Sequence, residues 1–371
     1  MKNVLVIGGC GFVGSHTSDA LLKAGHSVTV FDSLDKQVHG GGLPDYLSPE
    51  IEFIRGDVRD LDSLRKAVAK AEAIYHLAAA VGVGQSMYQI SDYCATNIQG
   101  TANLLQAILD TRSEPEKLIV ASSMSIYGEG RYVCVNCGDA APSTRTTKQL
   151  GHKQWELRCI LCGGLLTPVA TDEEKPLHCT SVYALSKKAQ EEMALLFGRT
   201  YGIPTVALRY FNIYGPRQSL SNPYTGVAAI FASRLMNGNA PIIFEDGRQT
   251  RDFVNVRDVV QANLLALSSS AIDGMAVNVG SGRPISICEV AHQMARTLGV
   301  TIAPRVQGAY RSGDIRHCFA DISAISSAAG YVPRVDFSAG LAELVEWINS
   351  QQAHDHTEEA LMQLTARGLV A

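Results

Sequence analysis

Short apolar runs alternate with amphipathic stretches along the first half of the chain. The apolar runs have a length typical of buried strands and lie at 4–7, 27–31, 52–55, 73–77 and 118–122. Stretches with helical periodicity stand between them, at 14–24, 61–69 and 93–111. This alternation predicts an α/β fold in which helices cover both faces of a doubly wound parallel sheet.

The second half of the chain is more mixed. The alternation stops between Glu129 and about Asp172, where neither strand nor helix periodicity is visible. It resumes with a helix at 181–200 and a strand at 205–210. Beyond these, loops rich in Asn, Pro and Gly separate further predicted helices, at 227–236, 256–268, 287–298 and 357–365. We interpret the region after Gly215 as a smaller α/β lobe with a charged tail.

Composition narrows the class of protein. Hydrophobic residues make up 46% and charged residues 18% of the 371 residues, which is typical of a globular protein. The net charge is -4 and no long run of Lys and Arg occurs, so a nucleic-acid partner is not expected. No apolar stretch reaches the roughly 18 residues of a membrane span, and the run at 4–7 is too short for a signal peptide. We therefore expect a cytoplasmic protein with reduced thiols and no membrane partner.

A glycine-rich loop follows the first predicted strand and opens a helix. Its sequence is Gly8-Gly9-Cys10-Gly11-Phe12-Val13-Gly14. Such glycines allow a tight turn and let the backbone approach a pyrophosphate at the helix N-terminus. A bare steric need for glycine in the turn is the alternative. Asp32 ends the second strand, where its carboxylate would bind the ribose hydroxyls of NAD and repel the 2′-phosphate of NADP.

Tyr183 and Lys187 are four residues apart and share one face of a predicted helix. A tyrosine has a pKa near 10 and is a poor base at neutral pH. A neighbouring ammonium, together with a positive nicotinamide ring, would lower that pKa and make a phenolate available. An exposed helix face with no chemistry is the alternative, but the glycine loop upstream favours a catalytic pair.

Four cysteines form two closely spaced pairs, Cys134-x-x-Cys137 and Cys159-x-x-Cys162. This spacing is close to that of a four-thiolate zinc site, and glycine follows each pair. Two disulfides are the alternative, disfavoured by a reducing compartment. Four thiolates leave no open position for water, so the predicted zinc is structural. The segment has too little apolar content to fold without the metal.

The loop spacing Gly-x-x-Gly-x-x-Gly, the Tyr183/Lys187 pair and the segment 122–128 resemble the extended short-chain dehydrogenase/reductase family, which includes NAD-dependent nucleotide-sugar epimerases and dehydratases. By register, the resemblance assigns Ser123 as the third catalytic residue, with Ser122 and Ser125 as alternatives. His76 receives no catalytic role. The residues that the resemblance implies as cofactor contacts are Gly8, Gly11, Phe12, Val13, Gly14, Asp32, Asp57, Val58, Leu77, Ala78, Ala79, Tyr183 and Lys187.

Three later segments resemble the substrate-binding segments of this family. Asn212 and Arg251 are implied contacts of a substrate diphosphate, Arg311 of a phosphate, and Asp314 of the nucleotide ribose; Ser123 would bind the sugar hydroxyl. The planar fork of arginine suits bidentate binding of phosphate oxygens. Each arginine alone could instead form a surface ion pair. Cys318 lies where some 4-epimerases gate the size of the sugar, although a buried core cysteine is equally consistent with the sequence.

The resemblance implies a redox-neutral 4-epimerase acting on a UDP- or dTDP-hexose through transient oxidation at C4. Met124 and Ser125 stand where the 4,6-dehydratases of the family carry an Asp-Glu acid–base pair, which disfavours dehydration. Alternatives are a nucleotide-sugar dehydrogenase, reductase or decarboxylase with net NAD turnover, and a non-catalytic NAD-sensing or zinc-ribbon adaptor protein. The inserted cysteine segment resembles that of a bacterial subgroup labelled dTDP-L-rhamnose 4-epimerase.

The same resemblance divides the chain. We predict an NAD-binding Rossmann-type domain at 1–128 and 173–214, with parts of 252–283, and a zinc-ribbon-like insert at 129–172. A nucleotide-sugar lobe would comprise 215–251 and 284–350, and a tail would comprise 351–371. The insert separates Ser123 from Tyr183, so we expect it beside the mouth of the site, as a lid or as a docking surface. A homodimer is expected through the helices at 93–111 and 181–200, as in other family members.

Overall fold

The computed structural model describes residues 1–40, 42–142, 144–224, 226–311, 313–351 and 354–371. Its main layer is a seven-stranded sheet with the order β13-β9-β5-β4-β1-β2-β3, and every neighbouring pair is parallel. The strands are β1 (Asn3–Ile7), β2 (Ser27–Asp32), β3 (Glu52–Arg55), β4 (Ala73–His76), β5 (Lys117–Ser123), β9 (Thr205–Tyr210) and β13 (Ala276–Val279). The predicted doubly wound sheet is confirmed.

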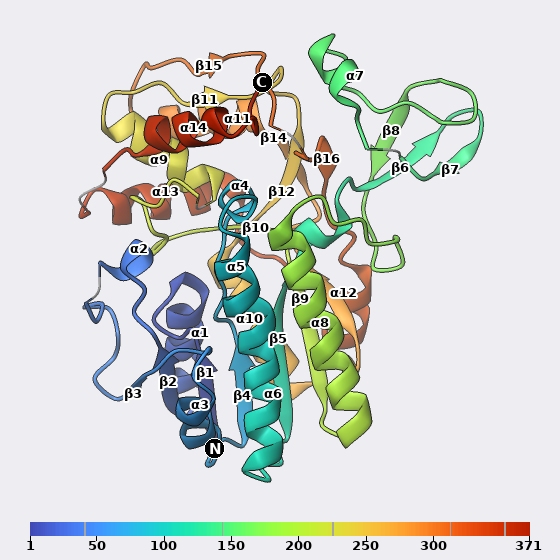
Figure 1. Cartoon of the computed structure of the whole chain (residues 1–371). Helices are drawn as coiled ribbons and strands as arrows, with labels where there is room; N and C mark the ends of the chain where they lie inside the picture. Colours follow the sequence, from blue (N-terminus) through green and yellow to red (C-terminus); the bar gives the residue numbers. More distant parts are fainter. Residues whose placement is uncertain (41, 143, 225, 312, 352–353) are drawn as a thin grey trace.

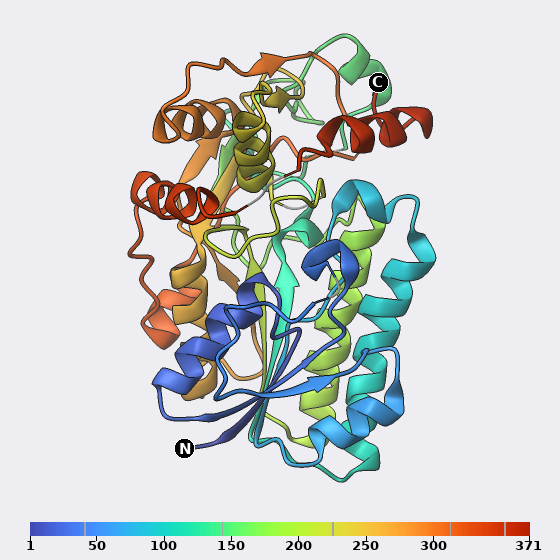
Figure 2. The ribbon, with the colours of Figure 1, turned by 90° about the vertical axis from the view of Figure 1, so that its left-hand side faces the viewer.

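Helices cover both faces of this sheet (Figures 1 and 2). On one face lie α3 (Leu61–Val68), α6 (Gly100–Asp110) and α8 (Val182–Tyr201); on the other, α1 (Phe12–Lys23) packs on α10 (Val256–Ser268). The strands are apolar on both faces because both are buried: Val4 and Val6 of β1 face α1 and α10, whereas Leu5 and Ile7 face α3 and α6.

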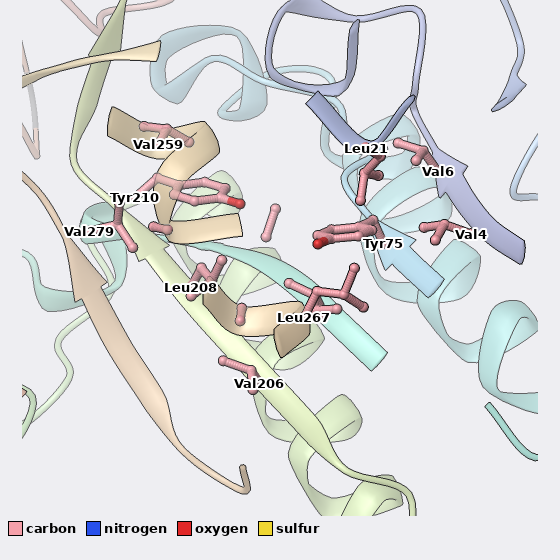
Figure 3. Packing of buried hydrophobic residues seen from close by; sticks show 14 of the residues in the cluster. Val4, Val6, Leu21, Tyr75, Val206, Leu208, Tyr210, Val259, Leu267 and Val279 are labelled. Carbon is pink, nitrogen blue, oxygen red and sulfur yellow. The ribbon is translucent and has the colours of Figure 1, made fainter. Parts of the chain in front are cut away.

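Polar groups within this core are satisfied by one asparagine of α10. Figure 3 shows the rings of Tyr75 and Tyr210 among the aliphatic side chains. The Tyr75 hydroxyl donates to the Asn263 carbonyl at 2.8 Å, and the Tyr210 hydroxyl donates to Asn263 Oδ1 at 2.6 Å. Asn263 Nδ2 in turn donates to Thr17 Oγ1 at 2.8 Å. These bonds fix α1 and α10 against the sheet and pair the two buried tyrosine hydroxyls.

A smaller lobe lies above the carboxyl ends of the strands in Figure 1. One of its sheets contains β10 (Asn212–Tyr214), β12 (Thr250–Asn255), β14 (Pro284–Ser286) and β16 (His317–Cys318), and the other pairs β11 (Ile242–Ile243) with β15 (Arg305–Val306). A separate apolar cluster joins its helices, which are α9 (Val227–Met236), α11 (Ile287–Thr297) and α13 (Phe337–Ile348). The smaller helix α12 (Ser323–Ala329) packs beside β13, and α14 (Thr357–Ala366) forms most of the tail.

The cysteine insert folds as a three-stranded antiparallel sheet with the order β7-β6-β8. Its elements are β6 (Arg131–Cys134), β7 (Gly138–Ala140), α7 (Thr147–Gly151) and β8 (Leu166–Val169). Hydrophobic periodicity did not predict them, because the strands are too short to show a period. A small cluster of Tyr132, Leu157 and Leu166 with two of the cysteines is the apolar core of the insert.

The predicted helix at 93–111 is interrupted. It consists of α5 (Ile90–Tyr93), a π-helical segment (Cys94–Gln99) and α6. Short helices α2 (Lys36–His39) and α4 (Val83–Ser86), and the longer α13, were also absent from the sequence prediction. A π-turn inserts an extra residue without changing the hydrophobic pattern, so periodicity does not reveal it.

No helix among the described residues is both long and apolar enough to cross a membrane. The domain boundaries drawn from the sequence remain a proposal. All strands of the seven-stranded sheet come from segments that this proposal assigns to the NAD-binding domain.

Candidate active site

One cavity of about 1330 Å³ lies between the carboxyl ends of the central strands and the smaller lobe. Residues that are far apart in the sequence meet there. Every predicted cofactor, catalytic and substrate residue lines it: Gly8, Gly11, Phe12, Val13, Gly14, Asp32, Asp57, Val58, Leu77, Ala78, Ala79, Ser123, Tyr183, Lys187, Asn212, Arg251, Arg311 and Asp314.

The glycine loop leaves room for an anion at the start of α1. Gly8 has φ +83°, a left-handed conformation that favours glycine. A Cβ at Gly14 would lie 2.1 Å from the Gly8 carbonyl oxygen, so the close turn excludes a side chain there. Gly11 caps α1 without a side-chain hydrogen bond, which leaves the first N–H groups of the helix facing the cavity. The residues present therefore fit a dinucleotide pyrophosphate.

Asp32 ends β2 beside this loop. Its carboxylate oxygens accept N–H groups of Cys10, at 3.0 Å, and Leu34, at 2.9 Å. These bonds orient the carboxylate at the cavity wall, where it can accept hydroxyl groups of a ribose. Farther along the wall, the Arg59 guanidinium hydrogen-bonds Asp57 and holds the pKa of that carboxyl below its usual value.

The catalytic candidates come from β5 and α8. Ser123 is the last residue of β5, and Tyr183 and Lys187 lie in the first two turns of α8. The Ser181 hydroxyl caps this helix by accepting the Ala184 N–H at 3.1 Å, which sets where its first turn begins. Ser123 and Tyr183 line the same cavity, and the Ser123 hydroxyl lowers the pKa of Tyr183, so the structure brings the predicted pair together.

The pKa of Tyr183 is not lowered, as the sequence had led us to expect, but raised. Burial raises the pKa of Tyr183, and the hydrogen bond with Ser123 offsets this only in part. Burial also lowers the pKa of Lys187 to about 7, although Glu191 opposes that shift. Lys187 Nζ donates to Gln190 Oε1 at 2.6 Å. Burial thus shifts both groups toward their neutral forms, the phenol of Tyr183 and the amine of Lys187.

The neighbouring serines have other partners. The Ser122 hydroxyl donates to Glu191 Oε2 at 2.6 Å, in a buried network where Glu191 also pairs with Arg209 at 2.6 Å. The Ser125 hydroxyl donates to Ser123 Oγ at 2.9 Å. The Ser122 hydroxyl is therefore held within a buried network, and that of Ser125 is bonded to Ser123. Of the three serines, Ser123 is best placed to contact a substrate.

The predicted substrate residues gather at the other end of the cavity. Arg311 donates two hydrogen bonds to Asp314 Oδ2, at 2.9 and 3.1 Å, and Arg251 Nη2 lies 3.8 Å from Asp314 Oδ1. Burial raises the pKa of Asp314, but the two arginines more than offset it, so the carboxyl is ionised at neutral pH. Asn212 Oδ1 is buried and has no hydrogen-bond partner within the described part of the chain. The two guanidinium groups fit a diphosphate, whereas the Asn212 Oδ1 atom can only accept a hydrogen bond from a ligand.

The four predicted zinc ligands form one cluster. Their sulfur atoms all lie within 4.8 Å of one another, and the Sγ atoms of Cys134 and Cys162 are 3.5 Å apart. A disulfide would need about 2.05 Å, whereas a tetrahedral zinc with bonds of about 2.3 Å sets its sulfurs roughly 3.8 Å apart. Backbone N–H groups of Cys162 and Leu161 point at Cys159 and lower the pKa of its thiol. The cluster fits a zinc ion.

The family model described as the NAD dependent epimerase/dehydratase family matches residues 4–147 and 164–280 of the chain. The chain belongs to this family. The gap in this match, residues 148–163, lies inside the insert, and residues 281–371 lie beyond the match.

Similar members of the epimerase/dehydratase family cover nearly the whole chain. A dTDP-L-rhamnose 4-epimerase from Burkholderia thailandensis is 33% identical over 94% of this chain and 95% of its own length. The UDP-glucose 4-epimerase of Thermotoga maritima, solved with UDP-glucose, is 30% identical with a TM-score of 0.78 over 94% of this chain and 98% of its own. That of Thermus thermophilus, solved with NAD, is 31% identical with a TM-score of 0.74 over 94% and 100%.

Asn97 was not predicted from the sequence, and the π-turn directs it into the core of the fold. Its amide accepts the Ala80 N–H at 2.8 Å and donates to the Ala80 carbonyl at 3.1 Å and to Ser186 Oγ at 2.9 Å. Asn97 thus joins the loop after β4 to the turn of α8 between Tyr183 and Lys187. No local motif marks this residue, since its role depends on the π-turn.

The contacts between the insert and the site were also not predicted from the sequence. No described residue of 129–172 lines the large cavity, so the insert is not a lid in direct contact with it. Instead Arg145 donates to the Asp314 carbonyl and to Glu245 Oε1, both at 2.7 Å. The fully buried Arg316 binds Glu156 of the insert and Glu245 of the smaller lobe. Cys318 is likewise buried in the core, and the cavity lining does not include it.

We predict that the buried His76 makes the stability of the folded protein depend on pH. Its Nε2 lies 2.9 Å from Thr101 Oγ1, which itself donates to the Asn97 carbonyl, so Nε2 carries the proton. The buried Nδ1 has no hydrogen-bond partner among the described residues. Burial lowers the pKa of His76 to about 3. The unfolded chain binds this proton near pH 6.5, so stability should fall as pH drops from about 6.5 to about 3, by about 1.4 kcal/mol per pH unit.

Thermal denaturation between pH 7 and pH 4 checks this prediction. The quantity compared is the slope of the unfolding free energy against pH, not the free energy at one pH. His76→Gln should flatten the acid-side loss relative to the wild type. His356→Gln, at an exposed ring, should retain it. The same slope in all three proteins would contradict the assignment of a neutral His76.

Proposed function

We propose that the protein is an NAD-dependent nucleotide-sugar 4-epimerase acting on a UDP- or dTDP-hexose. One observation carries the proposal: Ser123, Tyr183 and Lys187 line a single cavity between the glycine loop and the Arg251/Arg311 end. Such a cavity holds a cofactor and a diphosphate sugar with the reacting carbon beside a tyrosine. Met124 and Ser125 also line the cavity and supply no acid–base pair for dehydration.

The cofactor would lie along the glycine loop. Its pyrophosphate would meet the N–H groups at the start of α1, and Asp32 would accept its ribose hydroxyls. The segments around Asp57 and Leu77 complete the wall. When bound, NAD supplies a hydride acceptor for C4 of the sugar and returns that hydride.

The protein's own residues handle the proton. Tyr183 Oη removes the proton from the C4 hydroxyl and later returns it, while the Ser123 hydroxyl hydrogen-bonds the same oxygen. Lys187, buried beside Tyr183 on the same helix face, stabilises the phenolate when protonated. Ser125 orients Ser123 through their 2.9 Å hydrogen bond.

The far end of the cavity would hold the part of the substrate that does not react. Arg251 and Arg311 bind the diphosphate, Asn212 adds a hydrogen bond, and Asp314 accepts the nucleotide ribose hydroxyls. Anchoring at the diphosphate leaves the hexose free to turn over between the two hydride transfers. This rotation exposes the opposite face of C4 and inverts the hydroxyl.

Proton NMR of the purified protein with a panel of UDP- and dTDP-sugars, without added cofactor, tests the proposal. UDP-glucose and dTDP-L-rhamnose head the panel, since similar relatives carry these substrates in their names. A C4 epimer that appears at equilibrium supports the epimerase. No epimer, but NADH once NAD is supplied, would assign the protein to the dehydrogenases instead.

We further propose that Cys134, Cys137, Cys159 and Cys162 hold one structural zinc ion. The mutual distances of their sulfur atoms support this assignment. The insert would act as a brace rather than a lid, because Arg145 contacts the Asp314 backbone from outside the cavity. The contacts of Arg145 and Arg316 position the segment that carries the diphosphate-binding Arg311.

A homodimer through α6 and α8 is also proposed. These helices lie side by side on one face (Figure 1), and Leu185 and Leu196 of α8 are 55% and 58% exposed. The two leucines lie three helical turns apart on one face of the helix. Light scattering should give twice the chain mass. Leu185→Lys with Leu196→Lys should give the monomer, and Val332→Lys, also exposed, should not; a monomeric wild type would contradict the dimer.

A further inference from the structure

The helix of the tail, α14, presents one face to the cavity. Thr357, Ala360, Leu361 and Leu364 line it, with the spacing of a single helical face. Ala360 and Leu364 are each only 7% exposed, whereas Met362 on the opposite side is 64% exposed. The tail thus places apolar side chains in the cavity that also holds the predicted cofactor, catalytic and substrate residues.

This helix rests on the part of the cavity wall that leads to Tyr183. A Cβ built at Gly84 of α4 would lie 3.2 Å from Leu364 Cδ2, so the leucine packs directly on that glycine. Two residues farther, the Ser86 hydroxyl accepts the Tyr183 N–H at 3.0 Å. Tyr88 also holds the tail: its hydroxyl donates to Gln363 Oε1 at 3.2 Å, and its ring lies 4.4 Å from the Arg367 guanidinium. Figure 2 shows α14 above the segment that contains α4.

The other contacts of the tail are with the smaller lobe. Asp355, just before α14, lies 3.2 Å from the guanidinium of Arg234 on α9, and both side chains are buried. Asn239 Nδ2 donates to the same carboxylate at 2.8 Å. Residues 354–371 therefore span from one lobe to the other across the cavity.

The end of this segment reaches the diphosphate-binding candidates. Tyr310 and Ala371 exchange two backbone hydrogen bonds, of 2.8 and 3.1 Å, and Val370 pairs with Arg311. Arg311 in turn holds Asp314 through its guanidinium. The tail thus supports the backbone from which Arg311 enters the site.

We infer that residues 354–371 form a strap over the nucleotide-sugar site, and that Leu361 and Leu364 supply its apolar wall beside the hexose. This inference rests on the proposed function for the nature of the ligand. The hexose end is favoured over the base end because Leu364 packs on Gly84, close to the backbone contact of Tyr183. An apolar wall there excludes water from the reacting sugar and disfavours a charged hexuronate.

Isothermal titration of the full chain with UDP-glucose, dTDP-glucose, UDP and dTDP tests the wall. Leu364→Ala should weaken binding of the two sugar nucleotides about tenfold and leave binding of UDP and dTDP and the content of bound NAD unchanged. Met362→Ala, on the exposed side of the same helix, should bind all four ligands like the wild type. If Leu364→Ala does not fold, Leu361→Ala provides the same comparison at a half-buried position.

Equal affinities for sugar nucleotides in Leu364→Ala, Met362→Ala and the wild type would overturn the wall, even if epimer formation supports the proposed function. Weaker binding of UDP and dTDP by the same factor would also overturn it, since the leucine would then act away from the hexose. Binding that depends on Leu364 without any epimer would retain the wall and remove the epimerase. A wild type that binds none of the four ligands would remove both.

Discussion

Tyr183→Phe should lower kcat for C4 epimerisation by about 10²- to 10⁴-fold, because it removes the phenolic oxygen that we propose takes the C4 proton. The phenylalanine ring keeps the edge-to-face packing with Tyr93, whose ring centre lies 6.4 Å away. We therefore expect bound NAD and thermal stability to remain close to those of the wild type. Initial rates by NMR, with NAD content and melting temperature measured on the same sample, check the prediction.

Tyr201→Phe is the matched control, since Tyr201 lies on the same helix but is 53% exposed at its far end. Its rate should equal that of the wild type. Burial raises the pKa of Tyr183, so the rate of the wild type should also rise with pH on the alkaline side as the phenolate forms. Activity of Tyr183→Phe within threefold of the wild type would remove the tyrosine from the proton transfer.

Removal of the proposed zinc site should strongly lower the stability of the protein. Cys134→Ser with Cys159→Ser removes half of the proposed ligands, so residues 131–169 should lose their fold. Arg316, with 0% of its side chain exposed, would then lose Glu156, and Arg145 would leave Glu245 and Asp314. Breaking the Arg145–Glu245 pair, in which each side chain is only 3% exposed, costs about 3–5 kcal/mol. Calorimetry and metal analysis should show a lower melting temperature together with loss of one zinc per chain.

The same double variant should raise KM for the nucleotide sugar more than it lowers kcat. Its effect would reach the site through Asp314 and Arg311, for which we propose substrate binding, and not through Tyr183. Cys288→Ser, a half-buried cysteine of α11 outside the cluster, should change neither quantity. Full zinc content in the double variant would show that other ligands bind the metal, and unaltered kinetics in a folded, zinc-free protein would contradict the brace.

Much of the fold and the site could be predicted because the signals are local. The glycine loop, the Tyr183/Lys187 spacing and the paired cysteines each occupy a few consecutive residues, where backbone geometry sets what the residues can do. Strands buried on both faces are recognisable as apolar runs for the same reason. The insert strands and the π-turn gave no such signal, being too short or invisible to a hydrophobic period.

The sequence by itself thus determined a doubly wound sheet, a glycine loop at the start of α1, a helix that carries Tyr183 and Lys187, and a four-cysteine cluster. Only the tertiary structure decided which partners the serines 122, 123 and 125 have, that the insert contacts Asp314 from outside, and that Leu364 lies in the cavity. These features depend on contacts such as Arg145 with Asp314 and Leu364 with Gly84, between residues far apart in the chain. Such pairings follow from how packed layers meet, and no local spacing encodes them.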